Sequence, residues 1–282
     1  MLTAKNISKN FGEIKVLDNI NLNVEKGSIV SIYGSSGAGK STLLYILSTL
    51  DKPDKGEIQI DNLSISELKG DKLSDFRNDK VGFIFQFHNL LDEFNVLENV
   101  CLPGYVSSSN NSDTENKAKE LLKELGLSSR LNHKPNQLSG GEQQRVAIAR
   151  SLINSPEIIF ADEPTGNLDS LTEEELMGTL MNLVTENKKT LIVVTHDSKL
   201  AKLGDRQLVL ADGQIMAVGA TGLWYSTISK HSYVRIFQRD DSSELGWAQI
   251  GPDLVGEGFN DKFGSSIALS DDGKVVAIGA YS

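Results

Sequence analysis

The sequence predicts an α/β fold that contains a phosphate-binding loop, followed by a small all-β segment. Strand and helix signals alternate from the N-terminus to about residue 216. Near residue 37 a glycine-rich loop separates an apolar strand from a helix, which is the context that a phosphate-binding loop requires. After Val218 helical periodicity gives way to short β-like runs between Gly, Asp and Asn turns. We therefore expect a nucleotide-binding domain over residues 1–216 and a β-rich segment over residues 217–282.

The apolar patterns place the elements of the first domain in order along the chain. The candidate strands are short and rich in Ile and Val, as parallel strands covered on both faces should be. They are Leu2–Ile7, Ile29–Tyr33, Glu57–Ile60, Val81–Phe85, Ile158–Ala161, Leu191–Thr195, Gln207–Leu210 and Gln214–Val218. Helices are expected over Ser41–Leu50, Glu115–Leu125 and Gly141–Ile153. The polar run from Ser107 to Thr114 predicts a loop before the second helix.

Charge and cysteine content narrow the classes of function. The formal net charge is −10, whereas nonspecific binding to a nucleic-acid backbone needs a basic face, so we expect no nucleic-acid partner. Cys101 is the only cysteine, which excludes an intrachain disulfide and a cysteine-based zinc site. No apolar run reaches about twenty residues, the length of a membrane-spanning helix. If the protein works at a membrane, we expect another chain to span it.

The phosphate loop has the residue types that bind a nucleoside triphosphate. Its glycines let successive backbone N–H groups turn toward the β-phosphate, and the following helix adds its positive end. Lys40 would bridge the β- and γ-phosphates, and the Ser41 hydroxyl would bind Mg²⁺. The alternative is a Gly/Ser-rich turn ahead of an ordinary helix. The loop reads Gly34, Ser35, Ser36, Gly37, Ala38, Gly39, Lys40, Ser41, Thr42.

Polar side chains at three later strand ends complete a candidate site for ATP hydrolysis. The strand ending at Asp162 and Glu163 predicts a metal-binding carboxylate followed by a group that orients or deprotonates the attacking water. Gln86 ends the strand from Val81 and would reach Mg²⁺ and water through its amide. His196 follows the strand from Leu191 and would donate to the γ-phosphate, although a histidine in that place can also be structural.

Two further features predict contacts with the nucleotide. Phe11 would stack on the adenine, or would instead belong to the core. Ser139, Gly140 and Gly141 open a helix whose positive end and N–H groups form a second phosphate site. One nucleotide cannot easily occupy both phosphate sites within one chain.

On these motifs, residues 1 to about 217 resemble the nucleotide-binding subunit of ATP-binding-cassette (ABC) transporters. The resemblance implies a P-loop NTPase fold with a helical subdomain at about residues 87–155, and ATP and Mg²⁺ as cofactors. It also implies a homodimer in which each ATP lies between the phosphate loop of one subunit and the signature residues of the other. The signature residues match Ser139, Gly140 and Gly141. The family's D-loop aspartate matches Asp169. The partners implied are integral membrane permease subunits, at the cytoplasmic face of the inner membrane.

A narrower resemblance rests on the segment from Gln86 to Val100, which reads QFHNLLDEFNVLENV. It is similar to the permease-facing segment of the lipoprotein-releasing ATPases, except that Asp92 stands where that group usually has proline. Core packing of Phe87, Leu90, Leu91 and Phe94 is the alternative. Macrolide-exporter and cell-division ATPases share the stretch from Asp162 to Asp169, so that stretch does not separate the groups. A soluble ABC ATPase that does not serve transport is a further alternative.

The C-terminal segment resembles a single integrin-like FG-GAP propeller repeat. The residues that carry this resemblance are Tyr233–Gln238, Gly246–Gly251 and Phe263–Ala280. The β-like runs of this segment are Tyr233–Gln238, Trp247–Gly251, Ser266–Ser270 and Lys274–Ala280. One repeat cannot bury its faces without neighbours, so we expect a loosely attached appendage. The alternative for the whole chain is a surface-repeat binding module fused to an ATPase remnant.

Overall fold

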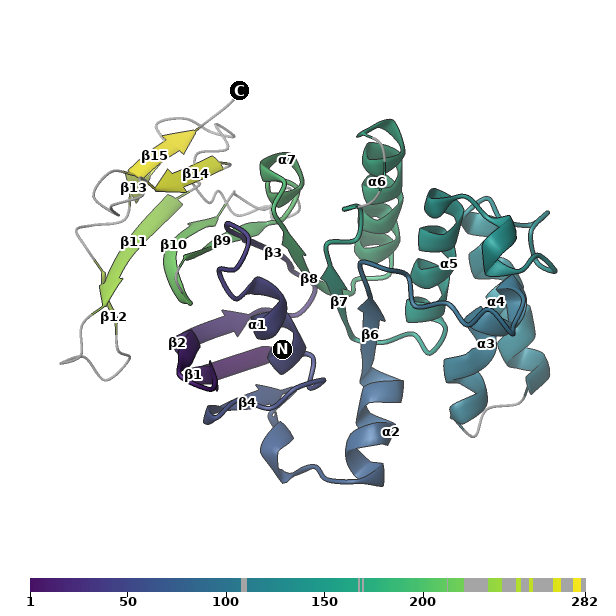
Figure 1. Ribbon diagram of the computed structural model, residues 1–282, viewed down its shortest axis with the longest axis horizontal. Coiled ribbons are helices and arrows are strands. Elements are labelled where there is room, and N and C mark those ends of the chain that lie inside the picture. The colour runs from purple at the N-terminus through teal and green to yellow at the C-terminus, as the bar shows by residue number, and fades with distance from the viewer. Residues whose placement is uncertain are drawn as a thin grey trace. The chain divides into compact units, whose positions relative to one another are not determined.

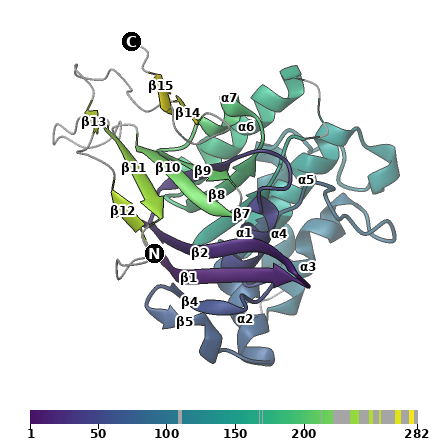
Figure 2. The same cartoon turned by 60° about the vertical axis from the view of Figure 1, so that its left-hand side comes forward.

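The computed structural model describes residues 1–107, 111–166, 168, 170–211, 213–220, 233–239, 247–249, 254–255, 266–269 and 276–279. The chain forms two compact units, one made of Met1–Ser66 with Ile192–Ser282 and the other of Glu67–Leu191. Figures 1 and 2 show their strands and helices in two views. Among the described residues, no helix is both long enough and apolar enough to cross a membrane.

The first unit contains an antiparallel sheet with the strand order β2-β1-β4-β5 (Figure 2). Side chains alternate between its two faces, and the apolar ones on one face, such as Leu2, Ile20 and Ile60, are fully or almost fully buried. β1 pairs with both β2 and β4, with Leu2 opposite Val24 and Ile60. The strands are β1 Leu2–Phe11, β2 Ile14–Val24, β4 Lys55–Ile60 and β5 Leu63–Ser64.

A second sheet of this unit carries the phosphate loop. Its strand β3 (Ile29–Tyr33) is almost wholly buried and pairs in parallel with β9 (Arg206–Ala211). Helix α1 (Lys40–Leu47) follows β3 and buries Leu43, Leu44, Ile46 and Leu47. The remaining elements of this region are β8 Thr190–Thr195, α7 Ser198–Ala201 and β10 Gln214–Ala220.

Beyond residue 220 the described residues between 233 and 255 continue this sheet. β11 (Tyr233–Arg239) pairs antiparallel with β10, and Val234 is fully buried. β12 (Trp247–Gln249) and β13 (Leu254–Val255) pair with β11. β14 (Ser266–Leu269) and β15 (Val276–Gly279) pair antiparallel with each other in a separate sheet. The four expected β-like runs each contain a strand. The domain boundary at residue 217 stays a prediction, and β10 runs across this position.

The second unit packs helices around the parallel strands β6 (Val81–Ile84) and β7 (Ile158–Asp162). Helices α3, α4 and α5 lie against one another (Figure 1), with Val100, Cys101, Leu122 and Val146 buried. The helices are α2 Asp71–Lys80, α3 Val96–Val106, α4 Asn111–Glu124, α5 Gly140–Leu152 and α6 Ser170–Glu186, and a 3-10 turn, η1, covers Ile65–Glu67 before them.

The predicted strands and helices of residues 1–218 are all present, with shifted ends. The expected loop up to Thr114 was wrong at its end, because α4 already begins at Asn111. Four long elements were not predicted: β2, α2, α3 and α6. For α6 the signal was present in the sequence, since Leu176, Met177, Leu180, Leu183 and Val184 form a buried stripe at helical spacing.

Candidate functional site

The phosphate loop has a backbone that only glycine allows at two positions. Gly39 begins α1 with φ 95°, and a Cβ there would lie 2.8 Å from the Val16 carbonyl oxygen. A Cβ on Gly34 would collide with the Leu210 carbonyl oxygen. Ser35, Ser36 and Gly37 between them are exposed. The middle of the loop is therefore accessible to a ligand, while its two ends are held close to neighbouring backbone.

Lys40 lies inside this loop rather than in solvent. Its side chain is buried, and its ammonium donates a hydrogen bond of 2.9 Å to the Ser35 carbonyl oxygen. The first turn of α1 contains no acidic residue and receives no side-chain cap from Gly39. A positive helix end and a buried ammonium thus occur together, which suits the phosphates of ATP. Ser41 and Thr42 follow in the first turn of α1.

The paired carboxylates lie in the second unit, where the structure brings Gln86 to Glu163. Asp162 is the last residue of β7 and is only 4% exposed. Glu163 leaves the strand with φ 41°, and its Oε2 atom accepts a hydrogen bond of 3.3 Å from Gln86 Nε2. The amide of Gly166 donates to the Glu163 carbonyl oxygen at 3.1 Å. A carboxylate oriented in this way can hold and polarise a water molecule.

The expected Mg²⁺ ligands fit that ion in their chemistry. Ser41, Gln86 and Asp162 supply a hydroxyl, an amide and a carboxylate oxygen, and Mg²⁺ prefers oxygen donors. Asp162 is buried at the end of its strand, where an ionised carboxylate gains from a cation. Within the described part of the chain, no three His, Cys, Asp or Glu side chains gather around a possible metal ion.

The signature residues form an exposed, strongly capped helix start. Ser139 caps α5: its Oγ atom accepts from the Glu142 amide at 3.2 Å, and the Glu142 carboxylate accepts from the Ser139 amide at 2.8 Å. The hydrogen bond from Arg130 (2.8 Å) and the backbone bond from Ser139 lower the pKa of Glu142 to about 2. Ser139 and Gly140 are exposed, whereas a Cβ on Gly141 would lie 2.7 Å from Thr172 Cγ2. The Ser139 hydroxyl accepts the cap, so its hydrogen can point outward.

The other predicted residues lie as follows. Phe11 ends β1 and is 54% exposed, so it does not belong to the core. His196 is exposed directly after β8, where the Asp197 amide donates to Thr195 Oγ1 at 2.9 Å. Asp169 lies outside the described residues. Phe11, the phosphate loop and His196 belong to the first unit, and Gln86, the carboxylates and the signature residues belong to the second.

Sequence reasoning missed the residues that shape the loop after Gln86. Buried Asn99 accepts from the Leu91 amide at 2.8 Å and donates to the Leu91, Phe94 and Asn95 carbonyl oxygens at 3.0–3.1 Å. A sequence signal was available, because Asn95 and Glu98 form a capping box at the start of α3.

The same loop is also held by α5. Arg150 donates to the carbonyl oxygens of His88 and Asn89, which both have positive φ. Burial, and then the charge of Arg150, lower the pKa of His88. Phe87 (72% exposed) and Leu91 (45% exposed) stand outward on this loop, so core packing does not account for them. The structure thus forms a fixed loop with an exposed apolar surface.

Comparisons with known proteins agree with this arrangement. Residues 17–166 match the family described as ABC transporter. The chain is 53% identical over 216 residues to the lipoprotein-releasing system ATP-binding protein LolD of Cytophaga hutchinsonii, covering 77% of this chain and 99% of that protein. It is 49% identical to the LolD protein of Bacteroides fragilis, with 77% and 100% covered.

A solved structure is similar as well. It is a dimer of the ATP-binding cassette MJ0796 of Methanocaldococcus jannaschii in a post-hydrolysis state bound to ADP and Pi. The sequence identity is 46% and the TM-score is 0.73, and the match covers 79% of this chain and 100% of that chain. The predicted P-loop α/β fold is thereby confirmed. These comparisons give no support to the likeness between the C-terminal segment and an FG-GAP repeat.

Proposed function

Because this chain belongs to the ABC transporter family, as one of its ATP-hydrolysing members, we propose that it drives the release of lipoproteins from the inner membrane through a permease. The observation that carries this substrate class is the likeness to lipoprotein-releasing ATP-binding proteins over nearly their full length. The described helices do not span a membrane, so the permease would be a separate chain bound at the cytoplasmic face.

Within one subunit, different residues would bind the phosphates, hold Mg²⁺ and activate the attacking water. Lys40 would exchange its bond to the Ser35 carbonyl for the β- and γ-phosphates, and the N-terminus of α1 would face the β-phosphate. Glu163, held by Gln86, would orient the attacking water and accept its proton. Ser41, Gln86 and Asp162 would hold Mg²⁺, which neutralises charge on the phosphates when bound. His196 would donate to the γ-phosphate, and Phe11 would stack on the adenine.

The signature residues would act on the nucleotide of a second copy. The exposed Ser139 hydroxyl and the N–H groups at Gly140 and Gly141 begin a helix whose positive end is suited to a γ-phosphate. The dimeric relative bound to ADP and Pi supports a homodimer in which each site combines two subunits. Asp169 would lie at the same interface.

Exposed Phe87 and Leu91 provide the surface on which a permease would dock. They belong to the loop that begins at Gln86, and Gln86 contacts Glu163, so one short segment would connect the permease with the water-activating group. Because the loop is held by Asn99 and Arg150, a displacement at Leu91 would be transmitted rather than absorbed.

Replacement of Glu163 by Gln tests the catalytic assignment. The amide keeps the hydrogen-bonding shape and removes the base, so we expect ATP hydrolysis to fall at least about a hundredfold while ATP stays bound and the protein elutes as a dimer. Glu174→Gln, an exposed carboxylate on α6, is the matched control and should retain full activity. Near-normal hydrolysis by Glu163→Gln would remove Glu163 from its role.

Mixing two inactive variants tests the shared site. Lys40→Ala should weaken ATP binding, whereas Ser139→Arg should preserve binding and abolish hydrolysis. An equimolar mixture should recover part of the activity, because one composite site then has both intact halves. Heterodimers that form without any recovery would contradict the shared site.

Copurification tests the transporter. The wild-type protein should retain a lipoprotein-releasing permease on a column, and Phe87→Ser with Leu91→Ser should lose it. Leu63→Ser, which removes a different exposed leucine, is the control. Retention by the double variant would place the docking surface elsewhere.

A further inference from the structure

The exposed ring of Phe11 has a cation beside it. Lys9 lies two residues earlier on β1, and its Nζ atom is 5.4 Å from the centroid of the Phe11 ring. Such an ammonium attracts the electron-rich face of an aromatic ring. Because Phe11 is 54% exposed, core packing alone does not fix its orientation. The contact with Lys9 restricts the ring to fewer positions.

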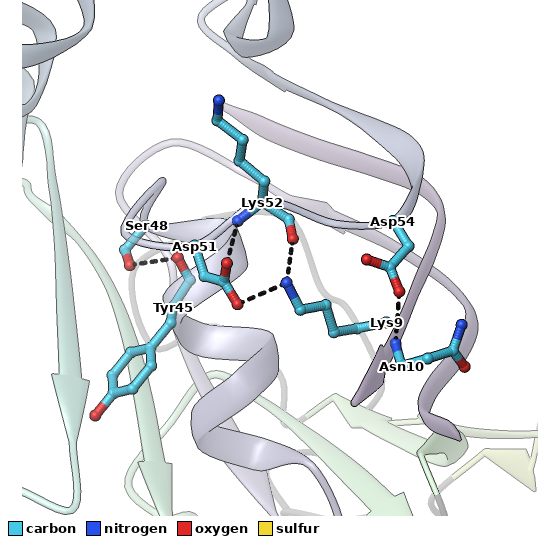
Figure 3. Close-up of polar contacts among 7 residues, drawn as sticks. All are labelled: Lys9, Asn10, Tyr45, Ser48, Asp51, Lys52 and Asp54. Carbon is cyan, nitrogen blue, oxygen red and sulfur yellow. Dashed lines mark hydrogen bonds and ion pairs between the residues drawn. The ribbon is translucent and has the colours of Figure 1, made fainter. Parts of the chain in front are cut away.

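Lys9 is itself held by two acceptors (Figure 3). Its ammonium lies 2.9 Å from Asp51 Oδ2 and donates to the Lys52 carbonyl oxygen at 2.7 Å. The Lys9 side chain is only 12% exposed, which is low for a lysine. The hydrogen bond from Lys9 lowers the pKa of Asp51, against a smaller opposing effect of burial. The Asp51 carboxylate therefore stays ionised at neutral pH.

These acceptors belong to the segment that follows the phosphate-loop helix. Asp51 comes four residues after the end of α1, and its amide donates to the Tyr45 carbonyl oxygen at 3.0 Å. The Asp51 carboxylate also accepts from the Lys52 amide at 2.7 Å. A second link between the same two segments is the hydrogen bond that the Asn10 amide donates to Asp54 Oδ2 at 2.7 Å. The end of β1 is thus bonded to the segment that directly follows α1, the helix that begins in the phosphate loop (Figure 3).

We propose that Lys9 is a positioning residue for the base of the nucleotide: anchored on Asp51 and Lys52, it fixes the ring of Phe11 at a set distance from the phosphate loop. The inference rests on the proposed function, in which Phe11 stacks on adenine. The face of the ring turned away from the ammonium receives the base. Lys9 does not touch the nucleotide, and its effect reaches ATP only through Phe11.

Two ligands separate base binding from phosphate binding. Affinities for ATP and for inorganic tripolyphosphate, each with Mg²⁺, are measured by calorimetry on the full chain. Phe11→Ala should weaken ATP binding about tenfold or more, the size of a base–aromatic stack, and should leave tripolyphosphate unchanged. Lys9→Met, which keeps the side-chain length without the charge, should weaken ATP binding about two- to fivefold and leave tripolyphosphate unchanged.

Three further variants make the test specific. Lys9→Arg keeps the cation and should bind ATP as the wild type does. Lys5→Met removes a lysine of the same strand that pairs with Glu57 at 3.9 Å, and should have no effect. In a Phe11→Ala background, Lys9→Met should cause no additional loss, because the ring through which it acts is gone.

The outcomes separate this inference from the proposed function. If Phe11→Ala leaves ATP affinity unchanged, adenine stacking itself is wrong. If Phe11→Ala weakens ATP binding but Lys9→Met does not, only the role of Lys9 is wrong. Two results would make Lys9 merely structural and overturn the inference. One is that Lys9→Met weakens the binding of ATP and of tripolyphosphate equally. The other is that Lys9→Met weakens ATP binding as much in the Phe11→Ala background as it does in the wild type.

Discussion

Replacement of Asn99 by alanine should destabilise the second unit more than the loss of any exposed asparagine. The Asn99 side chain is fully buried, and its amide contacts four backbone groups of the loop at 2.8–3.1 Å. Alanine leaves those groups without this partner. A buried polar group that loses its partner costs about 1–3 kcal/mol, but Leu91 is 45% exposed, so water can replace part of what is lost there. We expect the free energy of unfolding to fall by about 2–4 kcal/mol.

The assay is urea unfolding followed by far-ultraviolet circular dichroism, with the free energy taken from the midpoint at constant slope. Asn187→Ala is the matched control. Asn187 directly follows α6, and its side chain donates one hydrogen bond, to the Leu183 carbonyl oxygen, so this variant should lose only about 1 kcal/mol. Chymotrypsin should also cut Asn99→Ala sooner at Phe87 and Leu91. If the two variants lose the same stability and are cut at the same rate, Asn99 does not hold the loop.

Further predictions concern the signature region and the C-terminal segment. The folded-state pKa of Glu142, about 2, lies below its ordinary value, so the pair with Arg130 stabilises the protein above about pH 4.5 and loses this effect as the pH falls toward 2. Arg130 is 41% exposed, and solvent screening limits its contribution, so Arg130→Met should lower the free energy of unfolding by only about 1 kcal/mol at neutral pH. In urea unfolding this difference from the wild type should become smaller as the pH is lowered to about 3. Gly141→Ala should lower stability by about 1–3 kcal/mol through its contact with Thr172, and Thr172→Ser should restore it in the double variant; a thermal unfolding scan without such rescue would contradict the clash. Truncation after residue 220 should preserve ATP hydrolysis, and an unfolded or inactive product would show that β11 is required by the sheet.

The sequence alone determined the features that depend on neighbouring residues. The phosphate loop, the buried strands β3, β7 and β8, and the helix start at Ser139 were all predictable, because their glycines, apolar runs and caps act within a few residues of one another. Helix α6 was predictable by the same periodicity but was overlooked, while α3 contains Pro103, which argues against a helix in any reading of local sequence.

Only the tertiary structure decided which distant groups meet. Gln86 and Glu163 are 77 residues apart, and Arg150 reaches the backbone at His88 from 62 residues away. Nothing in the local sequence marks Lys9 for burial, yet it contacts Asp51, 42 positions later, and its side chain is only 12% exposed. Sequence spacing does not predict such pairs, because the packing of strands and helices decides which distant residues meet. The strength of each hydrogen bond then depends on how deeply it is buried. The sequence thus predicted the chemical groups of the proposed site, and the packing of the chain determined that Gln86 meets Glu163 within it.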